Sequence, residues 1–160
     1  MSKSLKRVRT ALETAGLAPT IVETEQSRTA VEAARSVGCV VDQIVKSIVL
    51  QGENSQQVFL FLTAGSNQVD VNKATALVGE PLSKADAALI RAQTGFAIGG
   101  VSPVGHLNPI RVFMDPALMQ FKTIWAAAGT PRHVFAADPD QIRSICHAVV
   151  SNFTVPPHAT

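Results

Sequence analysis

Apolar residues in the first part of this chain recur at helical spacing. Three of them lie three and four positions apart: Leu5, Val8 and Leu12. This spacing predicts an amphipathic helix that packs by one face and ends near Gly16. Residues 29–32, Thr-Ala-Val-Glu, have the form of a capping box, which predicts a second helix closing at Gly38. A short strand is expected between the two helices, at residues 21–25.

The middle of the chain changes from helical spacing to mainly apolar runs. Residues 40–50 and 58–62 are such runs, and the polar turn at residues 52–55 separates them. Two runs around a short polar turn predict a pair of antiparallel strands. Further helices are expected at residues 70–78, from 83 to about 95 and from 139 to about 149, and further short strands at residues 110–114, 123–127 and 133–136.

These elements follow one another in a mixed order rather than in strict alternation of strand and helix. No internal repeat, low-complexity block or linker divides them. We therefore expect an α+β fold in a single domain, residues 1–160, with a mixed or largely antiparallel sheet that curls between flanking helices. A chain of 160 residues, 46% of them hydrophobic, is long enough to bury a substantial core.

The charge balance limits the partners that the surface can attract. The formal net charge is only +2 and the charged fraction is 16%. No broad basic surface for tight, non-specific nucleic-acid binding is therefore expected, DNA is not a predicted partner, and any contact with RNA must be local. The basic residues near the start of the chain are expected on a solvated helix face: Lys3, Lys6, Arg7 and Arg9.

Membrane and disulfide signals are both missing from the sequence. Nowhere do roughly 18 apolar residues run together, and the N-terminal residues lack the continuous apolar segment of a secretory signal. Cys39 and Cys146 are far apart and lack metal-type spacing, which favours reduced thiols. The sequence therefore predicts a cytoplasmic protein without a membrane span.

Lys46 lies inside an otherwise apolar strand, residues 43–50. An unpaired ammonium is costly to bury, and desolvation lowers the pKa of a lysine, which prepares the side chain for chemistry or for an anionic ligand. This reading requires a partner in the interior or a cavity beside the amine. The alternative is an edge-strand lysine whose stem covers apolar surface while its head reaches water.

Residues 99–105, Gly-Gly-Val-Ser-Pro-Val-Gly, form the most unusual loop in the chain. Its glycines permit close backbone approach and positive φ, and Pro103 restricts its path. The loop is neither a phosphate-binding Gly-x-x-x-x-Gly-Lys loop nor a dinucleotide fingerprint. It is either a tight structural turn or a source of free backbone amides.

Side chains for covalent or metal-assisted chemistry do not stand out. No serine lies in a Gly-x-Ser-x-Gly elbow, and four histidines show no metal-ligand spacing: His106, His133, His147 and His158. We therefore expect neither a metal nor another cofactor. A strand lysine together with a glycine-rich loop suits electrostatic catalysis, in which amides hold an oxyanion and the ammonium holds a phosphate or polarises a carbonyl.

Five segments, in their order and spacing, resemble the YbaK/prolyl-tRNA synthetase-associated domain family over roughly residues 20–155. They are Lys46 in its Val-Lys-Ser strand, residues 69–73 at a helix entry, the loop at residues 99–105, Asp115 after an apolar run, and residues 125–129, Trp-Ala-Ala-Ala-Gly. The resemblance implies a mixed, barrel-like sheet surrounded by helices. It also implies a deacylase that hydrolyses the ester joining a wrong amino acid to the 3′-terminal adenosine of a tRNA.

The resemblance also implies roles for individual residues. The catalytic group comprises Lys46, Gly99, Gly100 and Ser102. The lysine is expected to contact the terminal phosphate region and the loop amides to position the ester, while water or the substrate's own 2′-hydroxyl assists. The substrate-binding group comprises Val101, Pro103, Gly105, His106, Asp115, Gly129 and His133.

Structural roles remain open for several of these residues. A loop serine such as Ser102 more often satisfies a local amide than it orients water or substrate, and His106 is expected to cap the turn rather than to touch the adenosine. His133 has a similar ambiguity, and Asp115, like Asp70, is suited to fix a neighbouring loop. Trp125 is expected in the core, with stacking on a base as the alternative.

The implied partner is the 3′ end of a mischarged tRNA. An ester is intrinsically labile, so positioning and oxyanion stabilisation can suffice without a nucleophilic side chain. The low net charge favours weak affinity for tRNA alone, so recruitment by an aminoacyl-tRNA synthetase is plausible. Two alternatives stay open: a non-catalytic module that binds a tRNA end or a synthetase, and a small-molecule hydrolase that uses the same pocket.

Overall fold

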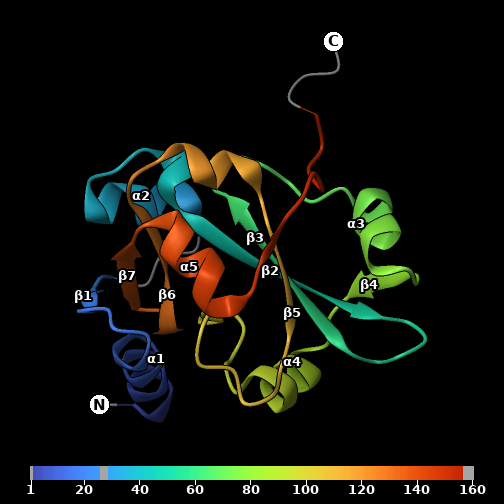
Figure 1. Ribbon diagram of the computed structural model, residues 1–160, viewed down its shortest axis with the longest axis horizontal. Helices are drawn as coiled ribbons and strands as arrows, with labels where there is room; N and C mark the ends of the chain where they lie inside the picture. Colours follow the sequence, from blue (N-terminus) through green and yellow to red (C-terminus); the bar gives the residue numbers. More distant parts are fainter. Residues whose placement is uncertain (1, 26–28, 157–160) are drawn as a thin grey trace.

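Two β-sheets form the frame of the molecule in the computed structural model, which describes residues 2–25 and 29–156 (Figure 1). The smaller sheet has three strands in the order β1 (Thr20–Glu23), β7 (His133–Ala137) and β6 (Ile124–Thr130). The larger sheet has five strands in the order β4 (Leu82–Lys84), β2 (Val45–Gly52), β3 (Val58–Ala64), β5 (Arg111–Met114) and β8 (Val149–Val150).

Five α-helices surround the two sheets: α1 (Lys3–Thr14), α2 (Ala30–Val37), α3 (Val71–Val78), α4 (Ala87–Thr94) and α5 (Pro139–Cys146). Short 3₁₀ helices at Val41–Gln43 and Pro116–Gln120 connect some of these elements. Helix α1 packs on the smaller sheet beside β6, and α2 lies across the entry to β2 (Figure 1). The helices therefore flank the junction between the two sheets.

The larger sheet is mixed and the smaller one antiparallel. Strands β2 and β3 form the predicted hairpin, in which Lys46 pairs with Thr63, while β5 pairs with β3 and β8 in parallel. A bridge between Ile44 and Trp125 joins the start of β2 to β6, so the two sheets curl toward each other. The predicted α+β fold with a mixed, barrel-like sheet is confirmed, since solved relatives share it.

Helix boundaries follow the capping residues of the sequence. The Thr29 hydroxyl accepts from the Glu32 amide at 3.1 Å, and the Asp70 carboxylate accepts from the Asn72 amide at 2.9 Å. Gly38 ends α2 in the left-handed conformation that glycine adopts without steric cost. The capping box and the predicted stop at Gly38 thus mark α2 as expected.

Three predicted boundaries are wrong, each because a tertiary contact overrides the local pattern. Residues 41–43 form a 3₁₀ helix, so β2 begins only at Val45. Residues 82–84 pair with β2 as strand β4 instead of starting a helix, and Asp86 is the cap of α4. The last helix ends at Cys146, and Val149–Val150 pair with β5 as strand β8.

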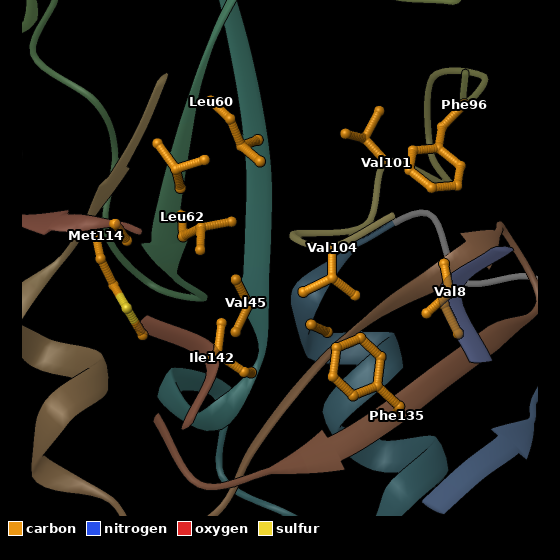
Figure 2. Packing of buried hydrophobic residues seen from close by; sticks show 14 of the residues in the cluster. Val8, Val45, Leu60, Leu62, Phe96, Val101, Val104, Met114, Phe135 and Ile142 are labelled. Atoms are coloured by element: carbon orange, nitrogen blue, oxygen red, sulfur yellow. The ribbon is translucent and has the colours of Figure 1, made fainter. Parts of the chain in front are cut away.

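The core is divided into two clusters by strand β3, which is buried along its whole length. The larger cluster joins α1, both sheets and α5, and Figure 2 shows ten of its members labelled, among them Val8, Val101 and Phe135. The smaller cluster is aromatic: Phe61 stacks on Phe113 with ring centroids 5.1 Å apart. The glycine loop and α1 therefore share one core.

Helix α1 differs from the predicted solvated face in one respect. Lys3 and Lys6 are exposed as expected, but Arg7 and Arg9 are half-buried, so the prediction was wrong for these two. None of the helices in the described ranges has the length and apolar character needed to cross a bilayer.

Candidate functional site

A half-open pocket of about 550 Å³ lies where the two sheets meet. Its walls come from the start of β2, from α2, from β6, from the start of β7 and from the first part of the glycine loop. The polar or backbone groups of interest that line it are those of Lys46, Ser47, Gly99, Val101, Thr130 and His133. The strand lysine and the glycine loop, about 50 residues apart in sequence, therefore share one cavity.

Lys46 has both a partner and a cavity. Its half-buried Nζ donates to the backbone carbonyl of Asn67, and its side chain lines the pocket. Burial lowers the pKa of the Lys46 ammonium, and the negative charges of Asp115 and Asp42 partly offset this effect. None of the described carboxylates is close enough to form an ion pair with it. The amine is thus available for an anionic ligand.

Two carboxylates fix residues 66–67, which include the carbonyl that accepts the hydrogen bond of the Lys46 amine. Asp42 accepts from the Ser66 amide at 2.9 Å. Asp115, which is only 2% exposed, accepts from the side-chain amide of Asn67 at 2.9 Å. Since the Asn67 carbonyl binds Nζ, Asp115 orients the lysine through one intervening residue.

Two residues of the glycine loop line the pocket and have amides without a hydrogen-bond partner in the described part of the chain. Gly99 and Val101 line the cavity, and their N–H groups have no hydrogen-bond partner within residues 2–25 and 29–156. Gly99 has φ +89°, a conformation that a residue with a Cβ rarely adopts. The Gly100 amide, in contrast, donates to the Ala97 carbonyl at 3.0 Å. The amides of Gly99 and Val101 therefore differ from that of Gly100 in being unpaired within the described residues.

Thr130 and His133 form the polar end of the pocket. The Thr130 Oγ1 lies 2.6 Å from His133 Nδ1 and accepts from the Arg132 amide at 3.1 Å. The other ring nitrogen, Nε2, lies 3.9 Å from the exposed carboxylate of Glu23. These contacts fix the imidazole at the wall of the cavity.

Residues 24–145, about three quarters of the chain, match the sequence profile of the aminoacyl-tRNA editing domain. The chain belongs to this family. The match includes Lys46, the whole glycine loop and the wall formed by Thr130 and His133. The resemblance to the YbaK/prolyl-tRNA synthetase-associated domains is thereby confirmed.

Relatives of this editing domain cover nearly its full length. The uncharacterised protein YwhH of Bacillus subtilis is 31% identical over 140 residues, 87% of this chain and 88% of its own. A crystal structure of a proposed trans-editing enzyme for prolyl-tRNA synthetase is 45% identical, with a TM-score of 0.89 over 97% of this chain and 99% of that one. A hypothetical protein of known structure is 25% identical, with a TM-score of 0.84 over 93% and 99%.

Within the editing domain, only part of the predicted site reaches the pocket wall. Four of the predicted residues line the cavity: Lys46, Gly99, Val101 and His133. The other seven are not among its lining residues: Gly100, Ser102, Pro103, Gly105, His106, Asp115 and Gly129. Five of these seven are buried, and Gly105 and His106 are half-buried.

Ser102 and His106, which do not line the pocket, make local contacts within the glycine loop and its surroundings. Ser102 is fully buried and its Oγ accepts from the Val104 amide at 3.2 Å. The His106 Nε2 lies 2.7 Å from the Ser102 carbonyl, and the imidazole meets the Phe96 ring edge-on. Burial lowers the pKa of His106, and the nearby Arg7 cation adds to this, against the effect of the Ser102 carbonyl.

Some site residues were missed by sequence reasoning. Thr130 follows the predicted Gly129 directly, and only the fold brings its hydroxyl onto His133. Asn67 has no motif of its own, because its contribution is a backbone carbonyl. Trp125, expected in the core, is half-buried and lines the pocket. Among the described residues no three His, Cys, Asp or Glu side chains gather as a metal site, and His158 lies outside that range.

Proposed function

We propose that this editing domain is a single-domain, trans-acting deacylase that hydrolyses the ester of a mischarged aminoacyl-tRNA at the 3′-terminal adenosine. The observation that carries the proposal is that Lys46 lines one pocket together with Gly99 and Val101, two residues whose amides have no hydrogen-bond partner among the described residues. Its volume of about 550 Å³ suits an aminoacyl group together with part of a nucleoside.

The loop amides supply the chemistry in this proposal. The ester carbonyl binds with its oxygen toward the N–H groups of Gly99 and Val101, which stabilise the negative charge of the tetrahedral intermediate. A water molecule attacks the carbonyl carbon, assisted by the 2′-hydroxyl of the same adenosine. The bond between the carbonyl carbon and O3′ then breaks, the amino acid leaves as the free acid, and the tRNA leaves with its 3′-hydroxyl restored. Losing one such donor typically lowers the rate about 100- to 1,000-fold.

Lys46 binds the phosphate that precedes the terminal adenosine. Its ammonium is half-buried and oriented by the Asn67 carbonyl, so little ordering is needed when an anion arrives. The proposed hydrolysis is direct, without a covalent intermediate; the described residues that line the pocket offer hydroxyls but no carboxylate or thiol as a nucleophile.

The proposed partners are the acceptor end of a mischarged tRNA and, through recruitment, an aminoacyl-tRNA synthetase. A net charge of +2 supports only modest affinity for tRNA alone. The solved relative described as a proposed trans-editing enzyme for prolyl-tRNA synthetase supports a synthetase as the recruiting partner. The proposed site of action is the cytoplasm, where these partners meet.

The deacylase proposal is tested on a panel of mischarged tRNAs with the wild type, Lys46→Met and the control Lys84→Met. Lys84 lies exposed on β4, and each methionine keeps an unbranched stem while removing the charge. We expect the wild type to hydrolyse at least one member, Lys46→Met to lose at least about 100-fold in rate, and Lys84→Met to match the wild type. Ester loss is followed by release of the labelled amino acid.

The outcome against the proposal is equally specific. Wild-type protein that leaves every ester decaying at the rate in buffer contradicts a deacylase. Saturable binding of tRNA without faster ester loss supports the non-catalytic binding module instead, and rapid hydrolysis of aminoacyl esters lacking tRNA supports a small-molecule hydrolase.

A further inference from the structure

Helix α1 closely approaches the glycine loop at Gly105 and strand β6 at Gly129, although it precedes the segment that matches the editing-domain family. Its buried residues Leu5, Val8 and Leu12 belong to the larger core cluster, which also contains Val101 of the glycine loop. Figure 2 shows Val8 between Phe96 and Phe135, with Val104 nearby. The helix therefore packs directly behind the site.

Arg7 links α1 to both ends of the segment that carries the glycine loop. Its Nη2 donates to the Gly95 carbonyl at 2.7 Å and its Nε to the Gly105 carbonyl at 3.1 Å. The guanidinium lies over the Phe96 ring, with Cζ 4.7 Å from the centroid. Gly99, one of the two residues with a free amide in the pocket, lies between the two anchored carbonyls.

The guanidinium is suited to this role by its geometry. Its planar fork of donors binds two carbonyls at once, each through a charge-assisted hydrogen bond. The Phe96 ring is fully buried, so the stacked cation cannot shift without disturbing the core. A lysine at this position offers a single ammonium and cannot match both carbonyls in the same plane.

Close backbone contact leaves the loop little freedom beside α1. A Cβ placed on Gly105, which has φ +81°, would lie 3.2 Å from the Arg7 carbonyl oxygen. The loop and the helix thus meet backbone to backbone, and Arg7 bonds on both sides of this contact. Displacement of the loop is therefore coupled to displacement of Arg7.

We propose that Arg7 is a positioning residue of the editing site: by binding the carbonyls of Gly95 and Gly105 it fixes the intervening loop so that the amides of Gly99 and Val101 face the ester. This inference rests on the proposed deacylase function. It assigns part of the site to a helix that the family match does not include.

The test uses the full chain with Arg7→Met, Arg7→Lys and the control Lys6→Met. Methionine keeps a stem over Phe96 and removes the donors, lysine keeps the charge, and Lys6 is an exposed neighbour on the same helix. Amide hydrogen exchange is measured in residues 96–105 and in β3. Steady-state kinetics with the best substrate of the panel give kcat and the tRNA concentration at half-maximal rate.

The expected pattern separates positioning from general stability. In Arg7→Met the loop amides exchange at least about tenfold faster while β3 is unchanged. In the same variant kcat falls about 10- to 100-fold, and the half-saturating concentration changes less than about twofold. Arg7→Lys lies between the wild type and Arg7→Met in both readouts, and Lys6→Met equals the wild type.

Three outcomes overturn the inference. The first is loop exchange that stays at the wild-type rate in Arg7→Met. The second is a loosened loop with unchanged kcat. The third is equal acceleration in β3 and in the loop for both Arg7 variants, which indicates loss of global stability. A wild type that hydrolyses no ester contradicts the deacylase proposal instead, and the exchange data then still decide whether Arg7 holds the loop.

Discussion

Asp115 does not line the pocket, but it affects the position and the pKa of Lys46, which does. Its carboxylate is buried and accepts hydrogen bonds from the amides of Ala64 and Ala117 and from the Asn67 side chain, at 3.1, 2.9 and 2.9 Å. Its negative charge also raises the pKa of Lys46 against the lowering effect of burial. The acid therefore orients the lysine and helps to keep it protonated.

Asp115→Asn is expected to lower the free energy of unfolding by about 1–3 kcal/mol, because the new amide group faces buried donors that it cannot accept from. Asp86→Asn is the matched control, since Asp86 is an exposed helix cap where asparagine caps as well. Urea unfolding of both variants measures the difference. Equal effects would show that burial of Asp115 has no special cost.

At the scale of elements, the contact between α1 and strand β6 depends on a glycine. Gly129 has φ +98°, and a Cβ placed there would lie 2.7 Å from the Ser4 carbonyl oxygen of α1. Only a residue without a side chain permits this approach, and the next residue, Thr130, lines the pocket. The seating of the helix and the shape of the pocket are therefore coupled.

Gly129→Ala is expected to destabilise the fold by about 3 kcal/mol, through both the strained φ and the clash with α1. Gly79→Ala isolates the first of these costs, because Gly79 has φ +92° but open space around it, and about 1–2 kcal/mol is expected. Thermal and urea unfolding compare the two. Similar losses in both variants would contradict a tight contact between helix and strand.

At the scale of the whole molecule, the half-buried His106 links stability to pH. Burial and the nearby Arg7 cation lower its pKa, so the unfolded chain binds the proton more readily than the folded one. Stability that this site contributes is present above the unfolded pKa of about 6.5 and is lost as the pH falls below that value. The loop that carries the proposed oxyanion donors thus becomes a weak point in acid.

His106→Gln is expected to flatten this dependence, since glutamine cannot be protonated but can still donate toward the Ser102 carbonyl. The free energy of unfolding is measured by urea titration between pH 7.5 and 5, with the exposed His147→Gln as the control for loss of an imidazole. A slope in His106→Gln as steep as in the wild type would contradict the link.

The residues that sequence reasoning placed correctly in the pocket differ in kind from those it missed. Lys46 is conspicuous because a charge interrupts an apolar run, and Gly99 because glycine clusters demand an explanation. Asn67 contributes only a backbone carbonyl, and Arg7 is one of several basic residues on a helix. Nothing local marks such residues, because their importance lies in what packs against them.

The sequence by itself determined the type and approximate extent of most elements, the hairpin that presents Lys46, and the family of the chain. It could do so because hydrophobic periodicity, helix caps and a charge within an apolar run are signals that span only a few neighbouring residues. Tertiary structure alone decided that 82–84 is a strand, that Gly100 and Ser102 do not line the cavity, and that Arg7 reaches across to Gly95 and Gly105. These outcomes depend on contacts between segments far apart in the chain, where packing and hydrogen-bond satisfaction outweigh local preference.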